Sequence, residues 1–284
     1  MILFLVESRQ LLFFTGATKF FHNFLPLYFL FGSLEHPGAS FEFLVDDMPR
    51  ILALHRECLD RISSLTGSSY YLHDVKTYSG RSKPLMQNSY RFLLQPFLQA
   101  EFVYIGDIDI IITENVIRKH MKYFSSGLPY YNFIRPGAKR LSGLHLARYE
   151  HFYPLAEDVW DYADLNDEEI LYKSYETRNA LCEEALVPLF QEIGRPNCGI
   201  HVSTNRLPFS MSRERAGWGI YARALKKIDH YFEDPEVRSV IGFMYQGSRT
   251  ILMNLIVIAR GLNGLSEDDR SLFLLKDNVL RLPT

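Results

Sequence analysis

Short apolar segments alternate with longer amphipathic ones along the first half of the chain. Four of the short segments are rich in aromatic and β-branched residues, as strands buried on both faces are. These four predicted strands span Leu11–Thr15, Phe41–Val45, Tyr70–His73 and Phe102–Ile105. The segments between them carry helical patterns and predict three helices, over Phe21–Leu34, Pro49–Leu65 and Asn88–Ala100. Strands and helices that alternate in this way predict an α/β fold with a parallel sheet covered by helices.

The pattern is less regular after Ile112. It predicts a helix, two strands and two further helices, over Glu114–Phe124, Tyr130–Ile134, Leu141–Leu146, Ala180–Ile193 and Thr250–Arg260. The chain contains no internal repeat, low-complexity tract or long linker. We therefore expect one domain over residues 1–284.

The composition is that of a globular chain without a charge bias. Hydrophobic residues make up 47%, and 31 basic residues face 33 acidic ones, so no basic excess argues for nucleic-acid binding. The apolar stretch Leu11–Phe31 is interrupted by polar residues and a proline that are costly in lipid, and we expect no transmembrane segment. Three cysteines without zinc or disulfide spacing suit a reducing compartment. We expect a cytoplasmic protein, with peripheral membrane association left open.

Two aspartates separated by one residue, Asp107 and Asp109, directly follow the predicted strand Phe102–Ile105, and apolar residues follow them. In an open α/β sheet, ligands bind beyond the carboxyl ends of the strands. Two carboxylates this close repel each other unless a cation lies between them or one is protonated. A divalent cation there would also bind the oxygens of a diphosphate. The pair therefore predicts a metal site, although a turn with both carboxylates in water is the alternative.

More than one class of enzyme has an Asp-x-Asp motif of this kind. A haloacid-dehalogenase-type phosphatase has Asp-x-Asp followed two positions later by Thr or Val, where this chain has Ile111, and places the motif on its first strand. A sugar nucleotidyltransferase would carry a basic, glycine-rich loop near the first strand, where only Lys19 is close. A non-catalytic sugar-binding protein is a third alternative.

The stretch from Asn88 to Asp109 resembles the family-eight glycosyltransferases, which have a helix with Tyr-x-Arg, a proline-containing helix end, an apolar strand and Asp-x-Asp. The resemblance covers roughly residues 11 to 206. It implies a GT-A, Rossmann-like fold with a mixed, mostly parallel sheet of seven or eight strands. It also implies retaining transfer from a nucleotide sugar, such as a uridine diphosphate sugar, to a glycan or lipid-linked acceptor, as in polysaccharide biosynthesis, with Mn²⁺ or Mg²⁺. The nucleotide-binding half would be about 1–112, and the acceptor and sugar half about 113–284.

The resemblance also suggests which residues bind the donor. The opening strand and turn would hold the nucleotide through Thr15, Gly16, Ala17 and Thr18. Ser142 and Gly143 would border the donor sugar, and Arg91 would lie in the active site. Asp46, at the end of the second strand, could meet the base or ribose, or belong to a capped turn before Pro49.

The remaining expectations concern the reacting end of the donor. Asp167 and Glu168 would face the reacting sugar, although Asn166 followed by acidic residues is also an ordinary helix start. His201 would complete the metal site with the two aspartates, and its imidazole suits manganese. Arg195 or Arg206 would replace the family's diphosphate-binding lysine. His145 is either near the sugar or structural. A basic loop that either faces an anion or is solvated contains Arg135, Lys139 and Arg140.

Overall fold

The computed structural model describes residues 11–75, 89–135, 137–188, 198–202 and 221–260. Its centre is a seven-stranded sheet with the strand order β3-β2-β1-β4-β7-β6-β8. The seven strands are β1 (Leu11–Gly16), β2 (Ser40–Val45), β3 (Ser69–Asp74), β4 (Phe102–Ile105), β6 (Tyr130–Ile134), β7 (His145–Arg148) and β8 (Leu186–Pro188). A separate two-stranded sheet pairs β5 (Ile110–Ile112) with β9 (Gly199–His201).

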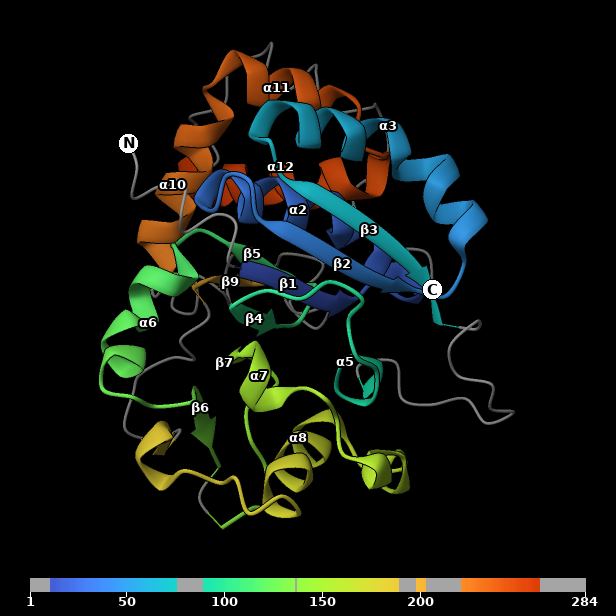
Figure 1. Ribbon diagram of the computed structural model, residues 1–284. Helices are drawn as coiled ribbons and strands as arrows, with labels where there is room; N and C mark the ends of the chain where they lie inside the picture. Colours follow the sequence, from blue (N-terminus) through green and yellow to red (C-terminus); the bar gives the residue numbers. More distant parts are fainter. Residues whose placement is uncertain (1–10, 76–88, 136, 189–197, 203–220, 261–284) are drawn as a thin grey trace.

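The large sheet is mixed but mostly parallel. β1 pairs in parallel with β2 on one side and β4 on the other, and β3 pairs in parallel with β2. β7 runs antiparallel to both β4 and β6, and β6 pairs in parallel with β8. The fold class predicted from the sequence, α/β with a mixed, mostly parallel sheet flanked by helices, is confirmed (Figure 1).

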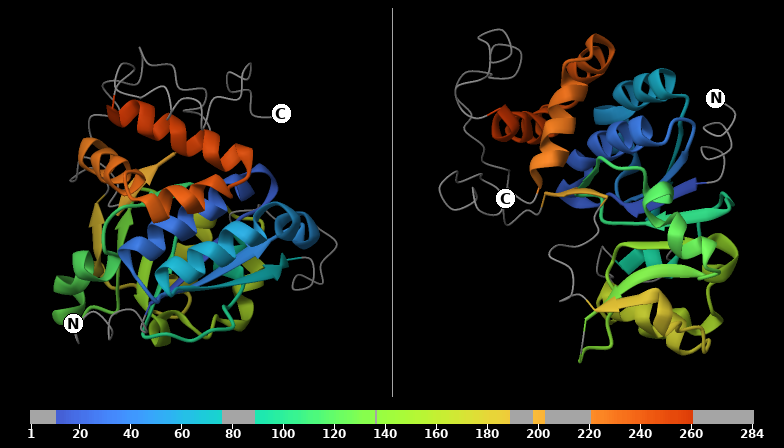
Figure 2. Two further views of the ribbon diagram at one scale, coloured as in Figure 1. Left: turned by 90° about the horizontal axis from the view of Figure 1, so that it is seen from above. Right: turned by 90° about the vertical axis from the view of Figure 1, so that its left-hand side faces the viewer.

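Helices cover both faces of the sheet. One face carries the 3-10 helix η1 (Lys19–Phe24) with α2 (Leu25–Glu35), α3 (Met48–Thr66), α10 (Ala222–Phe232), α11 (Pro235–Gly242) and α12 (Gln246–Arg260). The other face carries α5 (Tyr90–Leu93), α7 (Tyr149–Phe152), η3 (Glu157–Tyr162), α8 (Asp167–Glu176) and η4 (Glu183–Ala185). The remaining helix, α6 (Val116–Ser125), packs beside β6. Figure 2 shows α10, α11 and α12 together on the outside of α2 and α3.

The hydrophobic core lies in two layers because alternate residues of β1 point to opposite faces of the sheet. Leu11 and Phe13 are buried among α2, α3 and the C-terminal helices, whereas Leu12 and Phe14 are buried against α5, α7 and α8. Strands with both faces buried in this way need apolar residues at every position. The four strands predicted in the first half are confirmed for this reason, each to within one residue at either end.

Three predicted elements are wrong over much of their length. The helix expected over Asn88–Ala100 is wrong beyond Leu93, because Pro96 disfavours helix in the residue before it. The N–H groups of Phe97 and Leu98 instead donate to the buried carboxylate of Glu42, at 3.0 and 2.6 Å. Asn88 itself lies outside the described residues.

The strand expected over Leu141–Leu146 is also wrong in its first half. Leu141 makes a single bridge to Ile134, and β7 begins only at His145. Between them the Leu144 N–H donates to the Ser142 hydroxyl at 3.3 Å, which forms a local turn.

The helix expected over Ala180–Ile193 is wrong in its described part, which contains the short helix η4 and then β8. Pairing of Val187 with Phe133 in the sheet overrides the local helical pattern there. Residues 189–193 lie outside the described part.

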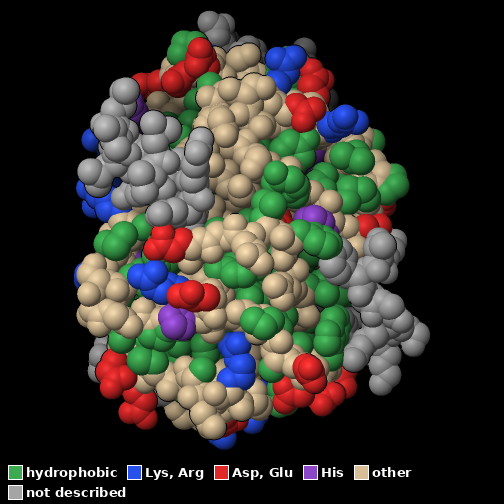
Figure 3. Space-filling model, viewed as in Figure 1, with side chains coloured by type: hydrophobic (Ala, Val, Ile, Leu, Met, Phe, Trp, Pro, Cys, Tyr) green, Lys and Arg blue, Asp and Glu red, His purple; other side chains and the backbone are tan. Residues whose placement is uncertain are grey.

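Among the described residues visible in Figure 3, acidic and basic side chains are interspersed and form no single-sign charge patch. None of the helices in the described ranges is long and apolar enough to cross a membrane.

Candidate metal and substrate site

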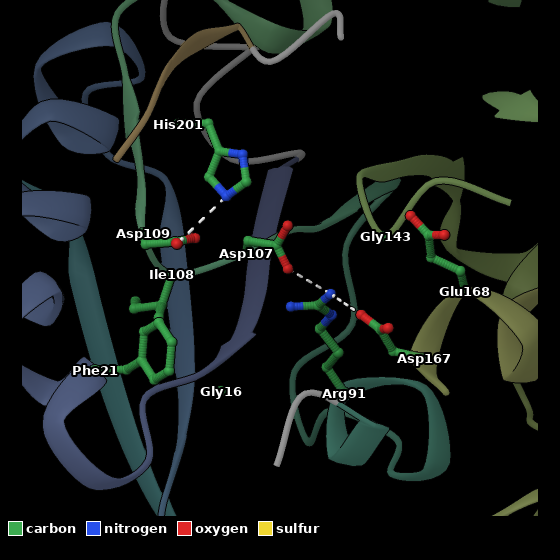
Figure 4. Close-up of a pocket in the computed structure, with 10 residues that line it drawn as sticks. All are labelled: Gly16, Phe21, Arg91, Asp107, Ile108, Asp109, Gly143, Asp167, Glu168 and His201. Atoms are coloured by element: carbon green, nitrogen blue, oxygen red, sulfur yellow. Dashed lines mark hydrogen bonds and ion pairs between the residues drawn. The ribbon is translucent and has the colours of Figure 1, made fainter. Parts of the chain in front are cut away.

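A pocket of about 230 Å³ lies at the carboxyl ends of β1 and β4. Because these two strands are parallel neighbours, the residues that follow them meet at the same edge of the sheet. β7 is antiparallel to β4, with His145 opposite Ile105, so the residues that precede β7 reach this edge as well. The residues that line the pocket are Gly16, Phe21, Arg91, Asp107, Ile108, Asp109, Gly143, Asp167, Glu168 and His201 (Figure 4).

The aspartate pair lies in a turn between β4 and β5, closed by an Ile110 N–H that donates to the Asp107 carbonyl at 3.2 Å. The carboxylates are nevertheless not simply in water, because Asp109 is only 7% exposed. Burial raises the pKa of Asp109, and its contact with His201 opposes this shift. A buried carboxylate with a raised pKa gains from a cation at short range.

His201 reaches this pair through the small sheet. β9 pairs antiparallel with β5, with His201 opposite Ile110, and the Val202 N–H donates to the Asp109 carbonyl at 2.8 Å. The His201 Nε2 lies 3.3 Å from Asp109 Oδ2. One ligand atom from each of Asp107, Asp109 and His201 lies within 4.8 Å of the other two. Two carboxylates and an imidazole are a donor set that suits Mn²⁺.

The wall opposite the metal cluster is built around Arg91, as Figure 4 shows. The Arg91 Nη2 lies 2.6 Å from Asp107 Oδ1 and 2.7 Å from Asp167 Oδ2, and the Nη1 donates to the Gly106 carbonyl at 3.2 Å. The Arg91 side chain is only 3% exposed. The guanidinium therefore joins the metal-side carboxylate to the first turn of α8. Burial raises the pKa of Asp167, and Arg91 partly offsets that shift.

The two acidic residues of this wall begin a well-capped helix. The Asn166 side chain accepts from the Glu169 N–H, and Glu169 reaches back to the Asn166 N–H, which is a capping box. Asp167 and Glu168 occupy the first turn, where the helix dipole favours negative charge. Asp167 and Glu168 therefore both begin an ordinary capped helix and line the pocket.

Gly143 closes the pocket between these two walls. A Cβ atom there would lie 2.7 Å from Arg91 Nη2 and 3.2 Å from Asp167 Oδ2, so the Arg91 guanidinium would have to shift. The neighbouring Ser142 is buried in the turn before β7 and does not line the pocket.

Other predicted residues lie near the pocket without lining it. Of the segment 15–18, Gly16 lines it, while Thr15 is buried and donates its hydroxyl to the Gly106 carbonyl at 2.7 Å. Ala17 and Thr18 are buried. Asp46 accepts from the Lys19 N–H at 3.0 Å, outside the pocket lining.

His145 is a structural histidine. It is fully buried, accepts from the Asn132 amide at 3.0 Å and donates to the Tyr175 hydroxyl at 2.7 Å. Burial lowers its pKa to about 3, so it is neutral in the folded protein. Arg195 and Arg206 lie outside the described residues.

Sequence reasoning missed two lining residues, Phe21 and Ile108. Ile108 could have been found because it lies between the two aspartates. Phe21 carries no such signal, since an aromatic residue beside a buried helix is most simply part of the core.

Comparisons with known proteins find similarity only to solved structures, at low sequence identity. No protein-family model matches the sequence, and no curated protein matches it. Among solved structures, the chain is similar to the glycosyltransferase GlyE of Streptococcus pneumoniae TIGR4, with 14% identity and a TM-score of 0.40, over 64% of this chain and 45% of GlyE. The matched part is thus less than half of the GlyE chain.

Two further likenesses have TM-scores of 0.37. One is to the galactosyltransferase LgtC, solved with donor and acceptor sugar analogues, at 13% identity over 63% of this chain and 72% of LgtC. The other is to apo mouse xyloside xylosyltransferase 1, at 15% identity over 63% of this chain and 84% of that chain. At such low identity, the function has to be inferred from the chemistry of this chain's own site.

Proposed function

We propose that the protein is a metal-dependent glycosyltransferase of the GT-A type, which transfers a sugar from a nucleotide-sugar donor to an acceptor. One observation carries the proposal. The cluster of Asp107, Asp109 and His201 lies at the carboxyl ends of parallel strands and faces a second acidic wall, Asp167 and Glu168, across one pocket. A cation site beside carboxylates that can accept hydrogen bonds from hydroxyls suits a diphosphate joined to a sugar.

The metal side would receive the diphosphate. Asp107, Asp109 and His201 would hold Mn²⁺, or Mg²⁺, and a bound cation would neutralise the charge of the leaving nucleoside diphosphate. The pocket is smaller than the 300–1,000 Å³ of sites that enclose a whole drug-sized ligand. We infer that it receives the part of the donor around the reacting bond.

The opposite wall would hold the sugar. A carboxylate that is ionised only accepts hydrogen bonds, and sugar hydroxyls are donors to it. Arg91 keeps Asp167 in a charged pair, and Glu168 lies beside it on the same helix turn. These two side chains would orient the sugar ring beside Gly143, which also lines the pocket.

Finer assignments belong to the same proposal. The resemblance to family-eight enzymes supports a uridine diphosphate sugar, retention of configuration and a glycan or lipid-linked acceptor. It also supports one catalytic unit over 1–284, with the nucleotide held near Thr15–Thr18 and Asp46, the sugar near Ser142, and the diphosphate by Arg195 or Arg206.

A turnover screen tests the proposal. The purified protein is incubated with nucleotide sugars in Mn²⁺ or in excess chelator, and released nucleoside diphosphate is measured. We expect turnover of at least one donor with Mn²⁺ alone. The Asp109→Asn variant should lose at least about 100-fold in kcat/KM, the scale on which one preorganised electrostatic contact acts. Asp164→Asn, which removes an exposed carboxylate outside the pocket, is the matched control and should keep wild-type activity.

Two outcomes would replace the proposal. Hydrolysis of small phosphate esters without turnover of any nucleotide sugar would indicate the phosphatase alternative. Formation of a nucleotide sugar from a nucleoside triphosphate and a sugar phosphate would indicate a nucleotidyltransferase.

A further inference from the structure

The basic loop between β6 and β7 is partly solvated, but each of its three cations also pairs with a carboxylate of α8. Arg135 pairs with Glu168, Arg140 pairs with Glu169, and Lys139 pairs with Glu176 at 2.8 Å. The backbone adds a link, since the Leu141 N–H donates to the Glu168 carbonyl at 3.1 Å. The loop therefore holds the helix whose first turn forms one wall of the pocket.

The three pairs differ in what they hold. Of the three carboxylates, only that of Glu168 lines the pocket. The Glu169 carboxylate completes the capping box outside it, and Glu176 lies at the last residue of α8. Only the Arg135 pair can thus act on a ligand in the pocket.

The Arg135 contact is two-pronged. Its Nε donates to Glu168 Oε2 at 2.7 Å and its Nη2 to Glu168 Oε1 at 2.9 Å. Such a paired contact fixes the orientation of a carboxylate as well as its charge. The Glu168 side chain is 15% exposed, so solvent screens the pair only in part.

The helix geometry explains why a second arginine is needed. Successive residues on an α-helix point about 100° apart, so one guanidinium cannot hold both Asp167 and Glu168. Arg91, from α5, holds Asp167 on the metal side of the wall. The side chain of Arg135, which directly follows β6, holds Glu168 from the other side. The backbone N–H of Arg135 donates to the Arg140 carbonyl at 3.1 Å, and this bond anchors the loop locally.

We propose that Arg135 is a positioning residue, which fixes the orientation of the Glu168 carboxylate so that it accepts hydrogen bonds from the hydroxyls of the bound sugar. This inference rests on the proposed function. Glu168 would then decide which sugar hydroxyls the site accepts.

A comparison of two arginine variants tests this role. Arg135→Gln removes the pair that holds the pocket carboxylate, and Arg140→Gln removes the neighbouring pair to Glu169 on the same helix turn. We expect Arg135→Gln to lower kcat/KM for the nucleotide sugar by about 10- to 100-fold. Losses of that size follow when a residue that orients a metal-binding side chain is removed. Arg140→Gln should change it less than about threefold. Both melting temperatures should fall by similar small amounts, because both pairs are partly exposed.

A double-mutant cycle separates positioning from a general structural role. In a Glu168→Gln background, Arg135→Gln should have almost no further effect on kcat/KM, because the group it positions has gone. Arg135→Lys should recover only part of the loss, since lysine keeps the charge without the two-pronged contact.

The outcomes distinguish the two proposals. Wild-type turnover with equal kcat/KM in Arg135→Gln and Arg140→Gln would overturn the role of Arg135 and leave the proposed function in place. Additive effects of the Arg135 and Glu168 changes would overturn it as well. Absence of turnover in the wild type with every nucleotide sugar would overturn both proposals.

Discussion

Replacing Gly199 by alanine should damage the metal site without touching any of its ligands. Gly199 lies in β9, two residues before His201, at a position where the backbones of β9 and β5 approach closely. A Cβ atom added there would lie 1.9 Å from the Ile111 carbonyl oxygen and 2.9 Å from the Ile112 Cα. Both neighbours are backbone atoms, which cannot rotate away as a flexible side chain could.

The magnitude follows from these distances. Real Cβ atoms stay at least 3.0 Å from other heavy atoms, so the two strands must separate by at least about 1.1 Å at this point, the difference between 3.0 and 1.9 Å. His201 lies opposite Ile110 in the same pairing, and its Nε2 would move relative to Asp109 by a similar amount. Binding sites tolerate displacements of about 0.5 Å, so we expect Mn²⁺ affinity to fall at least about tenfold, or roughly 1.4 kcal/mol.

Isothermal titration of Mn²⁺ into the wild type and the variant measures this effect. Gly242→Ala is the matched control, because a Cβ atom at that position would meet nothing within 4 Å. It should bind Mn²⁺ as the wild type does. The main sheet is separate from the β5–β9 pair, so the helical and sheet content of the Gly199→Ala variant should remain that of the wild type by circular dichroism. Unchanged Mn²⁺ affinity in Gly199→Ala would refute the role of the β5–β9 pairing in the site.

Two further predictions concern stability. Arg91→Met leaves the partly buried Asp107 and Asp167 without their shared cation. The free energy of unfolding should therefore fall by about 3 kcal/mol or more, the scale for breaking a buried ion pair. Urea unfolding measures this loss, and a loss below about 1 kcal/mol would contradict the pairing. Acid should also destabilise the protein, because burial lowers the pKa of four histidines to about 3 or 4 while the unfolded chain takes up their protons below about 6.5. Since the unfolded state then binds more protons, stability is retained above pH 6.5 and lost as the pH falls from there towards 4, by roughly 1 kcal/mol for each histidine between pH 7 and 5.5. Equal urea midpoints at pH 7 and pH 5.5 would contradict this expectation for the four residues, His36, His55, His120 and His145.

The parts of the fold that local pattern determines could be predicted from the sequence. The strands of the first half are apolar on both faces because helices cover both faces, and this leaves a clear signal. The end of α3 at Gly67 and its start beside Asp47, which caps the helix, follow from local chemistry too. The aspartate pair could be found because two charges one residue apart in an apolar stretch need a partner.

The parts that depend on distant residues could not be predicted. The segment after Leu93 has a helical pattern, but its N–H groups bond to Glu42, more than fifty residues earlier in the chain. Arg91 directly follows Tyr90, whereas the family motif Tyr-x-Arg has one residue between them. A four-residue helix nevertheless places the Arg91 guanidinium between Asp107 and Asp167. The pairing of Arg135 with Glu168 spans 33 residues, and no local signal connects them.

Thermal denaturation with nucleoside diphosphates, with and without Mn²⁺, tests the central claim most directly. The proposed function predicts that one nucleoside diphosphate raises the melting temperature only when Mn²⁺ is present. At a ligand concentration about 100 times the Kd the stabilisation should be roughly 2.7 kcal/mol, and the Asp109→Asn variant should lose it. If no nucleoside diphosphate shifts the melting temperature with Mn²⁺, or if Asp109→Asn shifts as the wild type does, the pocket is not the metal-dependent donor site proposed for it.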